Sequence, residues 1–94
     1  MKRQVRLTSA ANRDVVRLVE FLLDKNPNAA MRAADTLDLA MLSLAEFSER
    51  GRPGSEPNLR ELIVPFGSGA YVVQYRVDHD AVVVARIFHG REDR

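Results

Sequence analysis

The residues of this chain with the most chemical potential stand together near its C-terminus. The run 86–92 reads Arg-Ile-Phe-His-Gly-Arg-Glu, so it carries two guanidinium groups, an imidazole and a carboxylate. If residues 81–88 form a strand, Arg86 and Phe88 project from the same face and His89 lies at the strand's end. Arginine can hold a phosphodiester and histidine can move a proton near neutral pH, so this run could bind a phosphodiester and assist its cleavage.

Neighbouring strands could extend this C-terminal cluster with a tyrosine and two further arginines. The predicted target-binding residues are therefore Arg60, Tyr75, Arg76, Arg86, His89 and Arg91. A nuclease would use Arg86, His89 and Arg91 as its catalytic groups. The alternative interpretation is a solvated basic edge with a histidine in a turn, since a histidine and a few arginines are a weak signal.

Other kinds of chemistry are not indicated. The sequence has no glycine-rich phosphate loop before a helix, no GxSxG nucleophile motif and no HExxH zinc motif. It contains no cysteine and only two histidines, which excludes a thiolate or histidine-rich metal site. No metal or organic cofactor is expected.

Length and composition indicate a small globular protein. Its 94 residues predict one domain over residues 1–94, and 46% hydrophobic residues argue against general disorder. The formal net charge of +1 predicts no direct binding to nucleic acid, although residues 1–25 are basic and residues 26–49 acidic. No apolar stretch suits a signal peptide or a membrane span, so a cytoplasmic protein without membrane association is expected.

Hydrophobic periodicity predicts two helices after a short strand at residues 4–8. Apolar residues recur every three or four positions over residues 10–25 and again from Pro27 to Ser48. Thr8 and Ser9 offer cap oxygens for the first helix. Asn26 can cap the second helix, and Pro27 suits its first position. So short a link predicts an antiparallel helical hairpin.

Three more strands are predicted in the second half of the chain, at residues 59–64, 71–77 and 81–88. Residues 49–58 contain several glycines and prolines and are predicted to form a loop, and residues 65–69 a turn. The order β-α-α-β-β-β predicts a two-layer α+β fold, with a helical hairpin packed on a four-stranded, mainly antiparallel sheet. The chain has too few residues to cover the sheet's other face.

Three large apolar residues of the second helix fall outside its main apolar stripe: Met31, Leu39 and Leu42. They either pack against the sheet or stand singly on the surface, as many apolar residues do. The other interpretation is a surface for a partner.

Several segments of the chain resemble the ParE branch of the RelE/ParE toxin superfamily. They read LTSAANRDVVRLVEFL at 7–22, FSERGRPGSEPNLRELIVPFGSGAYVVQYRV at 47–77 and VVVARIFHGRED at 82–93. The resemblance implies the superfamily's fold and the toxin half of a bacterial type II toxin–antitoxin pair. It also implies a cognate antitoxin, ParD-like or similar, in a hetero-oligomer. The antitoxin would fold on binding, and we expect it to meet Met31, Leu39 and Leu42.

The resemblance leaves two activities open. ParE-like members inhibit DNA gyrase, whereas RelE-like members cleave mRNA on the ribosome. RelE-like nucleases often carry an arginine three residues before the strand tyrosine, where this chain has Val72 before Tyr75. Several also end in a catalytic tyrosine or a His-Tyr pair, where this chain has His89-Gly90. These departures favour gyrase inhibition through protein–protein binding, with a ribosome-dependent endoribonuclease as the alternative.

Overall fold

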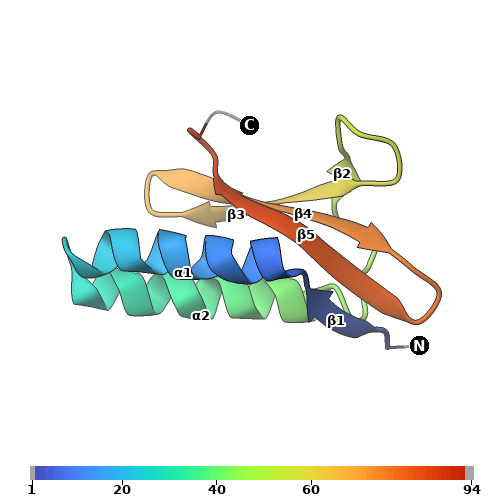
Figure 1. Cartoon of the computed structure of the whole chain (residues 1–94), viewed down its shortest axis with the longest axis horizontal. Coiled ribbons are helices and arrows are strands. Elements are labelled where there is room, and N and C mark those ends of the chain that lie inside the picture. The colour runs from blue at the N-terminus through green and yellow to red at the C-terminus, as the bar shows by residue number, and fades with distance from the viewer. Residues whose placement is uncertain (1, 93–94) are drawn as a thin grey trace.

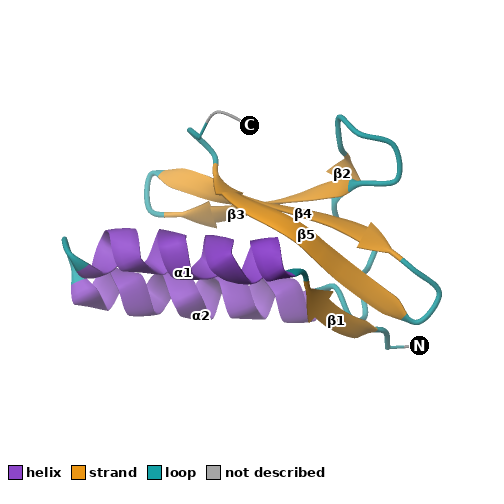
Figure 2. Ribbon diagram, in the orientation of Figure 1, coloured by secondary structure: helices purple, strands orange, loops and turns teal. Residues whose placement is uncertain are grey.

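A computed structural model of the chain describes residues 2–92 and consists of two layers (Figure 1). The elements in chain order are β1 (Gln4–Leu7), α1 (Ser9–Leu23), α2 (Pro27–Ser43), β2 (Arg52–Pro53), β3 (Arg60–Phe66), β4 (Gly69–Val77) and β5 (Ala81–His89). The two helices lie side by side along one face of a single sheet (Figure 2). The α+β class and the helical hairpin on a sheet are therefore confirmed.

Both helices begin where the sequence supplies a capping side chain. The Thr8 hydroxyl accepts a hydrogen bond from the Ala11 N–H at 3.0 Å. The Asn26 side chain accepts one from the Ala29 N–H at 3.2 Å, and Pro27 opens α2. These bonds satisfy N–H groups that have no partner inside the helix, as the cap residues predicted.

The second helix ends at Ser43 and not at Ser48 as predicted. The Leu44 N–H bonds to the Met41 carbonyl, a contact over three residues that tightens the last turn and ends the helix. Phe47, which the longer helix would have placed on the apolar stripe, is 63% exposed. Apolar spacing alone did not locate this end.

The sheet has five strands in the order β1-β5-β4-β3-β2, so the prediction of four strands was wrong by one. β1 runs parallel to β5, and every other neighbouring pair is antiparallel. The additional strand is β2, which pairs Arg52 with Glu61 and Pro53 with Arg60 in a segment predicted to be a loop. Two residues are too few to show an alternating pattern, and proline is tolerated on an edge strand.

The β3–β4 hairpin is longer than predicted. β3 continues through Pro65 and Phe66, which the sequence placed in the turn, and Phe66 pairs with Gly69. Pro65 is accommodated because β2 pairs only with the start of β3 and leaves this part of its outer edge free. The turn itself is formed at Gly67, whose φ of 59° is a conformation that glycine adopts readily.

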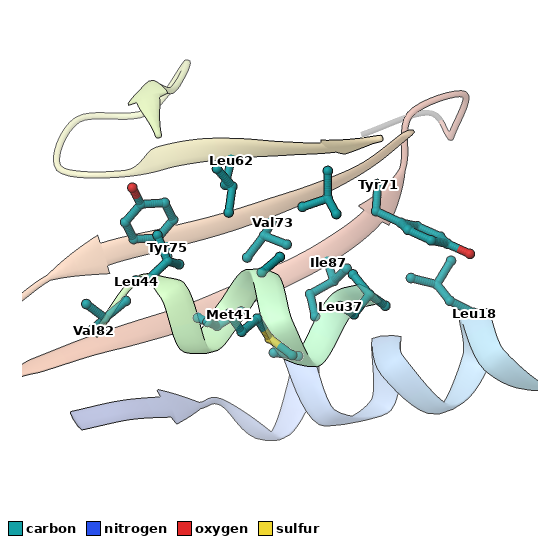
Figure 3. Close-up of a cluster of buried hydrophobic side chains, with 14 of the residues drawn as sticks. Leu18, Leu37, Met41, Leu44, Leu62, Tyr71, Val73, Tyr75, Val82 and Ile87 are labelled. Atoms are coloured by element: carbon teal, nitrogen blue, oxygen red, sulfur yellow. The ribbon is translucent and has the colours of Figure 1, made fainter. Parts of the chain in front are cut away.

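The core lies between the helices and the sheet (Figure 3). Tyr75 is completely buried in it, and its hydroxyl donates to the Ser48 carbonyl and accepts from the Gly51 N–H, both at 2.8 Å. A Cβ atom at position 51 would lie 2.6 Å from that hydroxyl, so glycine is needed there. Burial raises the pKa of Tyr75, which keeps the hydroxyl a donor.

The Tyr75→Phe substitution removes this hydroxyl and leaves the ring in place. It should lower the free energy of unfolding by about 1–3 kcal/mol, because a buried carbonyl and a buried N–H lose their partner. Urea unfolding followed by circular dichroism measures the change.

The matched control is Tyr71→Phe, whose hydroxyl has no hydrogen-bond partner within residues 2–92. Its effect should stay within about 0.5 kcal/mol. Equal losses for the two variants would contradict a specific role for the Tyr75 hydroxyl.

Candidate functional site

The structure divides the predicted target-binding residues between two places on the sheet. Arg60 lies opposite Tyr75 at one end of β4, whereas His89 lies opposite Tyr71 at the other end. A strand advances about 3.3 Å per residue, so the two groups are about 13 Å apart along β4. The predicted residues therefore do not form one compact site.

The group around Tyr75 has structural partners. The Arg60 guanidinium donates to the Gly51 carbonyl at 2.7 Å, and Arg76 pairs with Asp78 at 3.3 Å. Tyr75 presents neither its ring nor its hydroxyl to the surface. Its prediction as a target-binding residue is therefore corrected to a core residue, because both hydrogen-bonding capacities of the hydroxyl serve the protein's own backbone.

Arg86 is held by helix α1. Its guanidinium donates to the two carboxylate oxygens of Asp14 at 2.8 and 3.1 Å, and it stacks 4.9 Å from the Phe88 ring centre. The predicted common face of Arg86 and Phe88 is thus supported. The His89 ring instead packs edge-on against Tyr71, with ring centres 5.9 Å apart, on the helix side of the sheet. Arg86 and His89 leave β5 on opposite faces.

Asp14 also closes an open edge of the sheet. β1 pairs with β5 only as far as Leu7 and Val84, which leaves later backbone groups of β5 without a strand partner. Asp14 accepts a hydrogen bond from the Ile87 N–H at 2.8 Å, and Arg17 donates to the Ile87 carbonyl at 3.4 Å. Side chains of α1 thus provide hydrogen-bond partners for the backbone of β5 beyond the end of β1.

The pKa of Asp14 follows from these contacts. Its side chain is only 5% exposed, and burial by itself raises a carboxyl pKa. Hydrogen bonds from Arg86, the Ile87 N–H and Arg17 outweigh burial and hold the pKa of Asp14 below its ordinary value. The same hydrogen bond from Arg86 to Asp14 raises the pKa of Arg86. The pair is therefore charged at neutral pH.

The sequence prediction missed Asp14, although a signal was present. Asp14 follows Ala11 by three residues and precedes Leu18 by four, so it lies on the apolar stripe of α1. A carboxylate on a buried stripe calls for a charged or backbone donor nearby. The donor could not be named without knowing which strand edge meets this helix.

Glu92, the last described residue, joins the polar contacts around Asp14 through Arg17. Its carboxylate pairs with Arg17 and accepts a hydrogen bond from the His89 N–H at 2.7 Å. The Arg91 N–H donates to Nδ1 of His89 at 3.1 Å, so a neutral His89 carries its proton on Nε2. The Arg91 guanidinium has no hydrogen bond or ion pair with any residue from 2 to 92.

Helix α2 presents a second candidate surface, which we call the outer α2 face and define as Met31, Asp35, Asp38, Leu39 and Leu42. All five side chains are exposed, and the three apolar ones are 66%, 70% and 64% exposed in chain order. Packing of these apolar residues against the sheet is therefore excluded. Their spacing places them on one side of the helix.

Within residues 2–92 no group of three or more histidine, aspartate and glutamate side chains is arranged to hold a metal ion. No helix in the same part of the chain is long and apolar enough to cross a membrane. The arrangement offers hydrogen-bonding, ionic and apolar contacts to a partner.

The Asp14→Asn substitution should lower the free energy of unfolding at pH 7 by about 1–3 kcal/mol, because Arg86 loses a charged acceptor. The carboxylate contributes its stability above its unfolded-state pKa of about 3.9. That contribution is lost as the pH falls through the lower folded-state pKa. Urea titrations from pH 7 to pH 2 should show this step in the native protein and not in the variant.

Asp38→Asn, on the exposed outer α2 face, is the control and should change stability by at most about 0.5 kcal/mol. If Asp14→Asn were as stable as the native protein at every pH, Asp14 would have no role in holding β5.

Comparison with known proteins places this geometry in a family. Residues 5–94 match the family model described as the ParE toxin of the type II toxin–antitoxin system parDE. Toxin RelE3 of Caulobacter vibrioides is 47% identical over 92 residues, which cover 98% of this chain and 99% of that protein. Toxin RelE1 of the same organism is 44% identical over 84 residues, 89% of each chain.

Solved structures agree on the fold. The chromosomal ParDE toxin–antitoxin system from P. aeruginosa includes a chain that matches with a TM-score of 0.79 at 18% identity, covering 94% of this chain and 96% of that one. A chain of the RelBE2 toxin–antitoxin complex from Mycobacterium tuberculosis matches with a TM-score of 0.63 at 24% identity, covering 98% and 95%. The chain therefore belongs to the ParE toxin family of type II toxin–antitoxin systems.

Proposed function

We propose that this toxin acts in the cytoplasm by binding a protein target, DNA gyrase, and that a cognate antitoxin neutralises it. The observation that carries the proposal is the state of Arg86. Its guanidinium is paired with the buried Asp14 carboxylate and leaves β5 on the face opposite to His89. An arginine paired in this way offers a phosphate less net charge and fewer free donors than an unpaired one.

Cleavage of a phosphodiester needs cationic groups and proton-transfer groups around the same reacting atoms. Here Arg86 and His89 are on different faces, Tyr75 is buried, and Arg60 is bonded to the backbone. His89 and Arg91 remain available to a target, as does Arg76, which is exposed and pairs only with Asp78 at the surface. An imidazole and a guanidinium at the end of a strand suit recognition of an acidic protein surface.

The endoribonuclease alternative is favoured by the names of the relatives. Two of them are called RelE1 and RelE3. In that case His89 and Arg91 would be the catalytic groups that can reach the RNA without any rearrangement of the toxin. Arg86 would join them only after release from Asp14, which the present geometry opposes.

The antitoxin is expected on the outer α2 face. Two of the matching folds come from toxin–antitoxin systems, which supports a partner protein and a hetero-oligomer. The outer α2 face combines exposed apolar side chains with two carboxylates. An amphipathic segment with an apolar stripe and flanking basic residues would complement it.

Induction of the gene tests the proposed activity. Expressed alone the chain should arrest growth, and co-expression with the adjacent antitoxin gene should restore it. DNA synthesis, followed by labelled thymidine, should fall before protein synthesis does. Codon-phased mRNA 5′ ends within minutes of induction would instead support the endoribonuclease and contradict the gyrase proposal.

The outer α2 face can be tested with the double variant Leu39→Gln, Leu42→Gln, which keeps a good helix-forming residue at both positions. Loss of two exposed apolar contacts should weaken antitoxin binding by about tenfold or more, while toxicity is retained. Calorimetry with purified antitoxin measures the affinity.

The matched control is Leu23→Gln, at an exposed leucine of α1 outside this face. Its affinity for the antitoxin should equal that of the native protein. Unchanged binding by the double variant would place the antitoxin elsewhere on the toxin.

A further inference from the structure

A cleft of about 640 Å³ opens between α1 and the part of the sheet where β5 ends. Leu18 and Leu22 border it from the helix, and Phe66 and Tyr71 border it from the sheet. Phe21, which is 62% exposed, and Arg91 stand at its mouth. The cleft therefore combines an apolar floor with a charged rim.

Tyr71 is the unusual member of this floor. Only 3% of the residue is exposed, and its ring packs against Phe66 and His89 with ring centres 5.5 and 5.9 Å away. Its hydroxyl nevertheless has no hydrogen-bond partner within residues 2–92, in contrast to the doubly bonded hydroxyl of Tyr75. In Figure 3 it lies at the outer end of the cluster, beside Leu18.

This hydroxyl must open into the cleft. Every side-chain polar atom that is sealed from solvent in the described part of the chain has a partner, so the Tyr71 hydroxyl is not sealed. Tyr71 lines the cleft, which is the space its hydroxyl can reach. Burial raises the pKa of Tyr71, so the hydroxyl stays protonated and can both donate and accept.

Among the described residues, the rim carries one positive charge that has no ionic partner. Arg17 and Glu92 neutralise each other, while the Arg91 guanidinium has no ionic partner among residues 2–92. The Glu92 carboxylate also accepts the His89 N–H, which shows that a carboxylate fits at this rim. A ligand with a negative group beside its apolar part would complement these charges.

We propose that this cleft binds an aromatic side chain with a polar tip, a tryptophan or tyrosine, presented by a partner protein next to a carboxylate. The ring would lie on Leu18, Leu22 and Phe66, its tip would hydrogen-bond to the Tyr71 hydroxyl, and the carboxylate would pair with Arg91. Such residues are the common anchors of protein interfaces, since they combine large apolar area with one polar contact. Leu18 and Leu22 make part of the floor aliphatic, whereas sites for nucleobases rely on stacking against aromatic side chains, so a protein side chain is favoured.

The inference adds an attachment point to the proposed protein-binding function, but its test does not depend on toxicity. The full chain, labelled with ¹⁵N, is titrated with N-acetyltryptophan and with N-acetyltryptophan amide, which lacks the carboxylate. Shifts should be confined to amides around Leu18, Phe66, Tyr71 and Arg91. The acid should bind at about 0.1–1 mM, as expected for a fragment of this size, and more tightly than the amide.

Two variants separate the contacts. Tyr71→Phe should weaken binding of the acid about three- to tenfold, the effect of one lost hydrogen bond. Arg91→Gln should remove the preference for the acid over the amide. Arg32→Gln, at an exposed arginine of α2 without a partner in the described residues, is the matched control and should change neither.

Three results would overturn the inference: no shifts at about ten times the expected dissociation constant, shifts outside the cleft, or equal binding by Tyr71→Phe and the native protein. Tighter binding of uridine monophosphate than of N-acetyltryptophan would assign the cleft to a nucleotide, and this result would also overturn the inference. A toxin that fails to inhibit gyrase yet binds the acid in this cleft would refute only the proposed target.

Discussion

One buried carboxylate holds the end of this fold together. Asp14 reaches from α1 to the edge of β5 where β1 has ended, and it accepts hydrogen bonds from the Ile87 N–H and the Arg86 guanidinium. Arg17 pairs with both Asp14 and Glu92, so the C-terminal run is fixed to helix α1. An unpaired strand edge is costly when buried and prone to pairing when exposed, and these contacts avoid both outcomes.

The same contact bears on function. Arg86 belongs to the C-terminal run that the sequence marks as chemically promising, yet its charge is already compensated by Asp14. The RelE/ParE fold is shared by proteins with different activities, so the activity must be argued from the site. With Arg86 paired and Tyr75 buried, the part of the C-terminal run left to a target consists of His89, Arg91 and the adjoining cleft. Those groups favour recognition of a protein over cleavage of a phosphodiester.

Local patterns predicted most of the fold, and contacts between distant segments account for what they missed. The helices, their caps and the four long strands follow from apolar spacing and from Thr8, Asn26 and Pro27. β2 is too short to leave a pattern. An alternating pattern tells which side chains share a face but not how deeply they lie, so Tyr75 was placed on the surface. The roles of Asp14 and Arg86 depend on where β1 stops, which no local pattern contains.

The choice between binding a protein and cleaving RNA is tested most directly by plasmid supercoiling with purified gyrase. Relaxed plasmid, ATP and gyrase are incubated with increasing amounts of the toxin, alone and premixed with its antitoxin. If the toxin binds gyrase, supercoiling should be inhibited at micromolar toxin and restored by an equimolar amount of antitoxin. Full supercoiling at that concentration would contradict gyrase as the target, provided that induction of the same gene in cells arrests growth.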